Sequence, residues 1–154
     1  MQRMGFTTDH DLFRESVRHF VETEILPHDA RWETEGKVDK GMFLRAGEAG
    51  LLGMAVPEEY GGGGVDDYRF SAIIGEEVVG AGVGAAGMCI TLHNDVCLPY
   101  FLSYCSDEQK DRWLPGLVDG TLMTAIAMTE PGTGSDLAGI ATTARRDGDT
   151  YIVN

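Results

Sequence analysis

Residues 127–136 read Ala127-Met128-Thr129-Glu130-Pro131-Gly132-Thr133-Gly134-Ser135-Asp136. Pro131 holds the residue before it in an extended conformation, and the two glycines let the backbone approach a ligand closely or take a positive φ. The threonines and Ser135 add hydroxyls, so the loop can present amides and hydroxyls to a flat polar ring or a pyrophosphate. Composition alone favours a plainer interpretation, a turn between two strands. The stretch is neither a Walker A motif nor a Rossmann fingerprint, since it lacks Gly-Lys-Ser/Thr and opens no helix with G-x-G-x-x-G.

Strands are predicted on both sides of this loop. Residues 122–129 are small and apolar, which indicates a buried strand, and residues 140–146 and 150–153 read as two strands of a hairpin around Asp147-Gly148-Asp149. The sequence stops at Asn154, inside what should be a sheet. A hairpin with one further strand is marginal in water, so residues 121–154 are predicted to be the first strands of an incomplete β-domain.

Helices are predicted over residues 1–120, which makes the fold class mainly α with an all-α domain first. The first helix is capped by Thr7 or Thr8, and Pro27 either interrupts it or restarts it as a first-turn proline. Four more helices are expected over residues 42–49, 67–79, 83–103 and 106–120. The last opens with the capping box Ser106-Asp107-Glu108-Gln109. Between them, the four glycines of residues 61–64 predict a loop that is either specific or mobile.

The helix predicted over residues 83–103 contains no Lys, Arg or Glu and is apolar on nearly every face. Such a helix is buried within a larger protein. Met88, Leu92 and Val96 are spaced by four and share one face of it. His93 lies on the same helix and is interpreted as a satisfied core or pocket histidine rather than a proton-transfer residue.

Composition limits the remaining possibilities. The chain has 154 residues, of which 43% are hydrophobic and 24% are charged, as in a globular protein of one domain or one and a piece. Its formal net charge of -13 opposes binding to nucleic acid or to an anionic membrane. Three cysteines without close pairing predict neither disulfides nor a metal site. Because no signal peptide and no run of about 18 apolar residues is present, a cytoplasmic protein without a membrane span is expected.

Over essentially its whole length the chain resembles the acyl-CoA dehydrogenase family. The strongest match is the loop of residues 127–136, which is similar to the family's signature loop. The supporting matches are Leu51-Leu52-Gly53, Pro57-Glu58-Glu59-Tyr60-Gly61-Gly62, Gly75-Glu76-Glu77 and Ser106-Asp107-Glu108-Gln109-Lys110. Among subgroups the sequence is most similar to the long-chain type, through Ser135-Asp136-Leu137 followed by Gly139-Ile140 and through Ile90, Leu92 and His93.

The resemblance implies FAD as cofactor and an acyl-CoA as substrate. The flavin-contacting residues it implies are Ile126, Ala127, Met128, Thr129, Gly134 and Ser135. Ser135 would also contact the CoA side, and Met88, Leu92 and Val96 would line the acyl-chain tunnel, although plain core packing is the alternative for these three. Glu130 and Asp136 are not implied as bases, because the family's catalytic glutamate would lie downstream of Asn154.

The reaction implied is α,β-dehydrogenation of the thioester to a trans-2-enoyl-CoA, with electrons leaving through an electron-transfer flavoprotein. The 154-residue chain alone is expected to be inactive, and an acyl-CoA oxidase-like flavoenzyme, a non-catalytic binding or assembly fragment and a helical interaction domain are the alternatives. Family members are usually dimers or tetramers. An unpaired strand edge at residues 152–154 and the apolar helix also predict self-association into a homo-oligomer.

Overall fold

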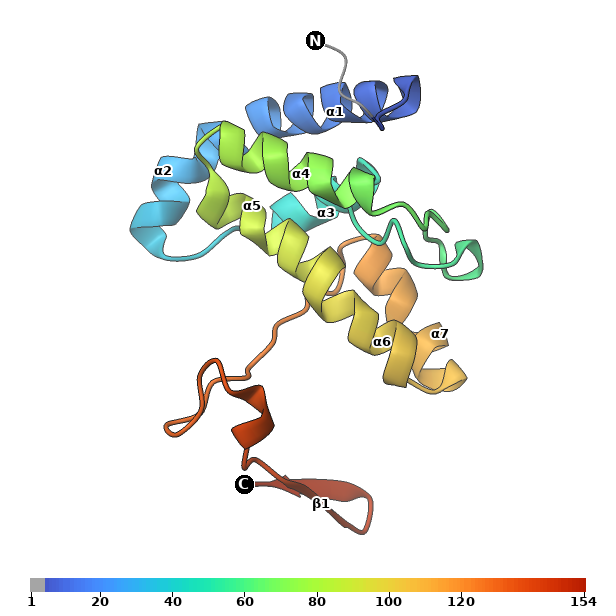
Figure 1. Ribbon diagram of the computed structural model, residues 1–154, viewed down its shortest axis with the longest axis vertical. Coiled ribbons are helices and arrows are strands. Elements are labelled where there is room, and N and C mark those ends of the chain that lie inside the picture. The colour runs from blue at the N-terminus through green and yellow to red at the C-terminus, as the bar shows by residue number, and fades with distance from the viewer. Residues whose placement is uncertain (1–4) are drawn as a thin grey trace.

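The computed structural model describes residues 5–154, and most of these residues are helical (Figure 1). The helical elements are α1 (Thr8–Phe20), η1 (Val21–Ile25), α2 (Leu26–Glu35), α3 (Lys40–Glu48), η2 (Glu58–Tyr60), α4 (Tyr68–Gly80), α5 (Gly84–Thr91), η3 (Leu92–Cys97), α6 (Leu98–Tyr104), α7 (Asp107–Val118) and η4 (Leu137–Gly139). The strands β1 (Ala144–Asp147) and β2 (Thr150–Val153) form one antiparallel hairpin. The mainly α fold class predicted from the sequence is confirmed.

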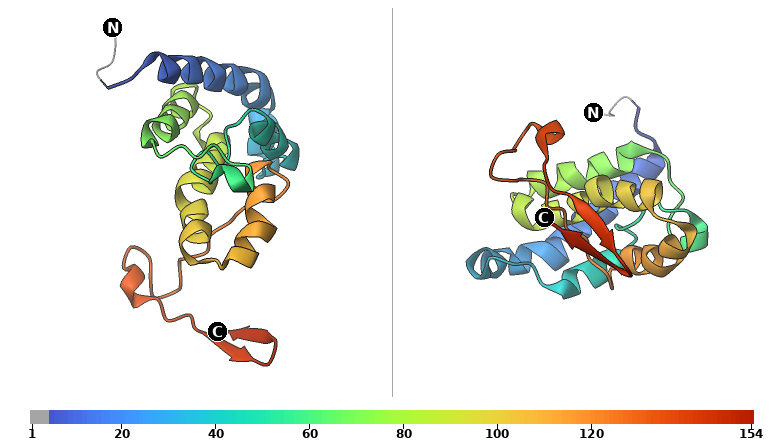
Figure 2. Two further views of the ribbon diagram at one scale, coloured as in Figure 1. Left: turned by 90° about the vertical axis from the view of Figure 1, so that its right-hand side faces the viewer. Right: turned by 90° about the horizontal axis from the view of Figure 1, so that it is seen from below.

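The helices α1 and α4 lie side by side and form one layer of the helical part (Figures 1 and 2). Thr7 is the N-cap of α1, and its N–H donates to Nδ1 of His10 at 3.1 Å. The apolar face of α1 packs into the main core, while its charged face pairs with the end of α4. Arg14 donates to both Glu76 and Glu77 at 2.7 Å, so charges tie together two helices that burial already holds in contact.

Two π-helical turns let the chain continue as a helix through prolines. In η1, the N–H of Leu26 donates to Val21, five residues back, and Pro27 then lies in the first turn of α2. In η3, Leu98 likewise donates to His93, ahead of the first turn of α6. Proline has no N–H, and its ring clashes with the carbonyl of the preceding turn. A wider π turn moves that carbonyl off the ring, which explains why Pro27 restarts the helix rather than ending it.

Glycines bring α3 against the end of α7. An added Cβ on Gly47 would lie 2.4 Å from the backbone carbonyl of Asp119, and one on Gly120 would lie 2.1 Å from the carbonyl oxygen of Phe43. Gly120 also has a φ of 78° and terminates α7, as predicted. Backbone therefore packs on backbone where the chain leaves its last long helix.

The glycine run of residues 61–64 is a specific loop. The N–H groups of Gly62 and Gly64 donate to Pro57 and Val56, at 3.2 and 2.9 Å. A Cβ on Gly62 would lie 2.0 Å from the carbonyl oxygen of Val56. This close approach requires glycine at position 62. It lets the loop fold back on the apolar segment that ends at Val56.

The C-terminal residues differ from prediction in two places. Residues 122–129 were predicted to be a buried strand, yet they are extended without a partner strand among residues 5–154, and Leu122 is exposed. The hairpin is confirmed, with Ala144 opposite Val153 and Gly148 in the turn at a φ of 61°. Its first strand begins at Ala144 rather than at residue 140, because the amides of Ala141 and Thr142 donate to the side chain of Glu130. Figure 2 shows this hairpin standing apart from the helices.

Candidate functional site

The segment of residues 123–129 leaves the helices as an extended chain whose backbone is free to bind. None of its N–H or C=O groups makes a hydrogen bond to another residue within 5–154. Burial alternates along it, with Thr124, Ile126 and Met128 half-buried and Ala127 and Thr129 exposed. Main-chain groups left unpaired in this way are available to a further strand or to a polar ligand. Four of the predicted flavin-contacting residues lie here, in one continuous row.

The loop that follows is closed by its own hydrogen bonds. Glu130 and Thr133 exchange backbone hydrogen bonds of 3.0 and 3.1 Å around a tight turn at Pro131 and Gly132. The hydroxyl of Thr133 points inward and donates to the carbonyl of Gly139 at 3.0 Å. This threonine is buried, so its hydroxyl shapes the loop and is not presented to a ligand, in contrast to the sequence interpretation.

The remaining predicted residues of this loop, Gly134 and Ser135, are exposed. A Cβ added at Gly132 or Gly134 would meet no atom within 4 Å, so the outer side of the turn is open. Together with the exposed hydroxyl of Thr129, the loop offers hydroxyls and amides on an unobstructed edge. This is the donor set that a polar ring or a phosphate requires.

Glu130 ties the loop to the chain ahead of the hairpin. Its two carboxylate oxygens accept from the backbone N–H groups of Ala141 and Thr142 at 2.9 and 2.8 Å. The side chain of Thr142 first, and then the backbone N–H groups of Ala141 and Thr142, lower the pKa of Glu130 by hydrogen bonding to its carboxylate. The carboxylate occupies the amides that a strand starting at residue 140 would need, so β1 starts later. A carboxylate held in this way is a weak general base.

The three predicted acyl-chain residues meet in one surface hollow between α4 and the helix formed by α5 and η3. Met88, Leu92 and Val96 line it, and its volume is about 440 Å³. Four residues make slightly more than one turn of an α-helix, so residues spaced by four rotate gradually around its axis. The π turn of η3 holds more residues per turn and compensates for this rotation, which keeps the three side chains on one face. The hollow also contains polar groups from both sides, namely Tyr68, Ser71, Thr91 and Asp95.

Burial of this helix is one-sided within residues 5–154, so the prediction that it is buried all round in a larger protein stays a prediction. Met88 is 61% exposed, and Val96 and Tyr100 are also exposed, whereas Ile90 and Leu98 are buried. The other helices cover only the face that carries Ile90 and Leu98. The uncovered face is the one that carries the three acyl-chain candidates.

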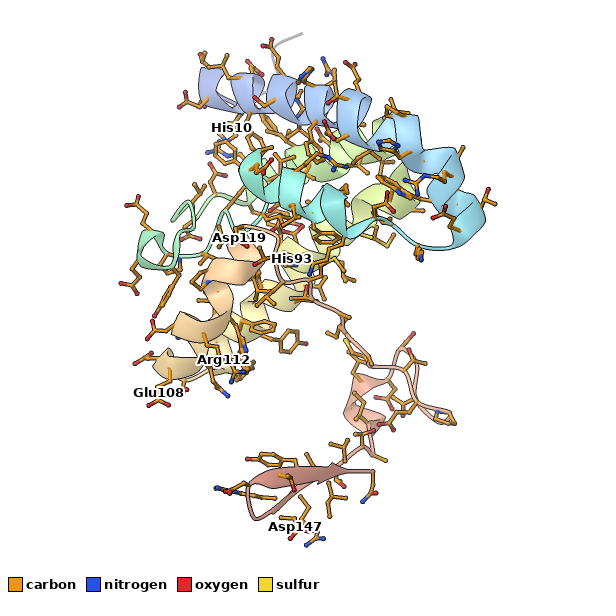
Figure 3. All side chains as sticks on the ribbon, turned by 180° about the vertical axis from the view of Figure 1, so that it is seen from behind. His10, His93, Glu108, Arg112, Asp119 and Asp147 are labelled. Atoms are coloured by element: carbon orange, nitrogen blue, oxygen red, sulfur yellow. The ribbon has the colours of Figure 1, made fainter. Side chains whose placement is uncertain are left out.

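His93 fixes the start of the extended segment. Its side chain is fully buried, with Nε2 2.8 Å from the carbonyl of Leu117 and Nδ1 3.0 Å from the hydroxyl of Thr124. Burial lowers the pKa of His93, so the ring is neutral; the carbonyl assigns the proton to Nε2, and Thr124 donates to Nδ1. Figure 3 shows His93 near Asp119, where the chain leaves α7. Both ring nitrogens are used for structure, which confirms the core interpretation of this histidine.

Asn94, the next residue, holds the other side of the same helix. Its Nδ2 donates to the carbonyl of Leu51 at 2.7 Å, and its Oδ1 accepts from the N–H of Gly53 at 3.0 Å. No sequence pattern marked Asn94 as important. The signal available was an amide side chain on a largely apolar helix without Lys, Arg or Glu, and its partner is a Gly-containing segment with backbone groups to satisfy.

The comparisons with known proteins agree with this geometry. A model of the acyl-CoA dehydrogenase N-terminal domain matches residues 7–121. The chain belongs to the acyl-CoA dehydrogenase family. This family member is 44% identical over 152 residues to the mitochondrial long-chain specific acyl-CoA dehydrogenase of Sus scrofa, with 99% of this chain and 35% of that protein covered.

Solved structures of acyl-CoA dehydrogenases share its fold. The enzyme from Geobacillus kaustophilus superposes with a TM-score of 0.89 at 46% identity, covering 99% of this chain and 40% of that one. The Bacillus anthracis acyl-CoA dehydrogenase complexed with FAD gives a TM-score of 0.86 at 33% identity, covering 100% and 26%. The chain thus spans well under half the length of these relatives. No helix within residues 5–154 is long and apolar enough to cross a membrane.

Proposed function

We propose that this chain is the N-terminal part of an FAD-dependent acyl-CoA dehydrogenase, with an all-α domain over residues 1–120 and the first strands of the β-domain over residues 121–154. The observation that carries the proposal is the unpaired backbone of residues 123–129 leading into an open, hydroxyl-bearing loop. In a chain of this family, that edge is where a flavin would be held.

The residues present fit FAD. Thr129 and Ser135 carry exposed hydroxyls, Gly134 leaves the turn open, and the amides of Ile126, Ala127 and Met128 are free. When bound, FAD supplies the acceptor for the hydride from the substrate. Neutral donors such as these hydroxyls and amides stabilise negative charge that develops next to them. Ser135 would also meet the CoA side of the substrate.

The substrate proposed is an acyl-CoA thioester whose chain lies along Met88, Leu92 and Val96. Leu92→Trp in the full-length flavoenzyme that carries this sequence should shorten the preferred acyl chain, because the indole fills the hollow. Val79→Trp is the matched control, since Val79 is exposed at the end of α4 outside the hollow lining. Unchanged chain-length preference in the Leu92 variant would contradict the placement.

The proposal also includes a catalytic base, an electron acceptor and an oligomeric state. The base that removes the α-proton is proposed to lie downstream of Asn154, the electron acceptor to be an electron-transfer flavoprotein, and the enzyme to be a homo-oligomer. An oxidase would instead return electrons to oxygen. The first measurement is intact mass with a visible spectrum, followed by enoyl-CoA formation with and without the electron-transfer flavoprotein. Product formed at a useful rate by the isolated 154-residue chain would overturn the assignment of the base.

A further inference from the structure

Asp95 is a carboxylate at the edge of the proposed acyl groove. It lies on η3 between Leu92 and Val96 and lines the same hollow of about 440 Å³. It also lines the two adjoining hollows, one beside the segment of Asp66 and Asp67 and the other beside Tyr100. The side chain is therefore at the point where the three surface depressions meet.

Binding a purely apolar chain against a half-buried carboxylate costs free energy, because the carboxylate loses hydrogen bonds to water. Asp95 has no ion pair with any residue from 5 to 154, and its hydrogen-bonding side chain is Ser71 on α4. Burial raises the pKa of the Asp95 carboxyl, while the Ser71 hydroxyl opposes that rise. One serine donor leaves most of the acceptor positions of the carboxylate to water. An alkyl chain laid over it would displace that water and put nothing in its place.

We propose that Asp95 is a specificity-determining residue that selects acyl chains bearing a hydroxyl where they cross η3. Such a hydroxyl would donate to the carboxylate and replace the displaced water, and hydrogen bonds to an ionised acceptor are the stronger kind. Tyr68 lines the same hollow, and its hydroxyl can donate to the oxygen of that hydroxyl. The inference rests on the proposed function, because it assumes that the hollow holds the acyl chain.

The test compares acyl-CoA substrates in the full-length flavoenzyme that carries this sequence, loaded with FAD. Saturated acyl-CoA esters are paired with esters of the same length in which one hydroxyl is moved along the chain, and kcat/KM is measured for each. At one hydroxyl position kcat/KM should exceed that of the plain chain by about tenfold, which is the ratio that a difference of about 1.4 kcal/mol in binding produces. Asp95→Leu should abolish this preference, and Asp95→Asn, which keeps an acceptor, should retain part of it.

Two controls separate specificity from structure. Asp111→Leu removes an exposed carboxylate on α7 and should leave the preference unchanged. Ser71→Ala removes the tie between α4 and η3 while keeping the carboxylate, so the preference should persist even if the melting temperature falls. The inference is overturned if no hydroxyl position is preferred, or if Asp95→Leu lowers kcat/KM equally for plain and hydroxylated chains. If no acyl-CoA is oxidised by the flavin-loaded parent, the proposed function itself fails, and the inference falls with it.

Discussion

Replacement of Gly47 by alanine should destabilise the protein, although helix propensity alone predicts the opposite. Gly47 lies inside α3, where alanine is favoured over glycine by up to about 1 kcal/mol. The added methyl group would lie 2.4 Å from both the carbonyl carbon and the oxygen of Asp119. Those are backbone atoms that no rotamer change can move, so either α3 or the end of α7 must shift.

The net effect follows from these two contributions. Overpacking costs about 1–3 kcal/mol, and a clash with backbone belongs at the upper end of that range. Subtracting the propensity gain leaves a loss of about 2 kcal/mol, which lowers the melting temperature of a chain of this size by about 4–8 °C. Gly75→Ala is the matched control, because Gly75 lies inside α4 and a Cβ there meets no atom within 4 Å. It should raise the melting temperature by about 2–4 °C.

Thermal unfolding followed by far-ultraviolet circular dichroism measures both variants against the parent. Opposite signs for the two substitutions are expected. If Gly47→Ala stabilised the chain as Gly75→Ala does, the close approach of α3 to the end of α7 would be wrong, and the path by which the chain reaches residues 123–129 would need to be redrawn.

Three further outcomes are expected. His93→Phe leaves two hydrogen-bonding partners unpaired and should lower the free energy of unfolding in urea by about 2–4 kcal/mol; a loss below about 0.5 kcal/mol would contradict the buried network. Arg31 lowers the pKa of Asp39 from 3.8 to about 2. This pair therefore stabilises the fold above about pH 4 and loses its effect towards about pH 2, so Arg31→Gln should lower the melting temperature at neutral pH but not at about pH 2. Glu130→Ala should speed hydrogen exchange at the amides of Ala141 and Thr142, which its carboxylate binds, and Glu130→Gln should speed it less. If the two variants protected these amides as well as the parent does, the hydrogen bonds of Glu130 would be refuted.

The helical part was predictable because its signals are local. Caps at Thr7 and Ser106, the stop at Gly120 and apolar spacing along each helix all act within a few residues of where they appear. The π turns were not predictable from periodicity, since they shift a helical pattern by a single residue. Pro27 alone was ambiguous, because whether a proline ends or restarts a helix depends on the hydrogen bonds of the turn before it.

The sequence predicted part of the geometry at the candidate site, while the ligands of these residues stay a prediction. The row from Ile126 to Thr129 and the groove of Met88, Leu92 and Val96 came from resemblance and spacing. The inward turn of Thr133 and the double hydrogen bond of Glu130 depend on residues six to twelve positions away, Gly139, Ala141 and Thr142. Such loop closure has no periodic signal. The strand expected at residues 122–129 was missed because a strand is defined by its neighbour as much as by its own sequence.

The wide turn η3 corresponds to one extra residue in an otherwise α-helical stretch. Loss of a single codon within Leu92–Cys97 would convert the π turn to an α turn, which absorbs the deletion and leaves α5 and α6 in nearly the same register. Leu98 could therefore stay in the core. The carbonyl four residues before Pro99, however, would lie against the proline ring. In the evolution of this stretch, the extra residue and the proline are expected to be kept or lost together.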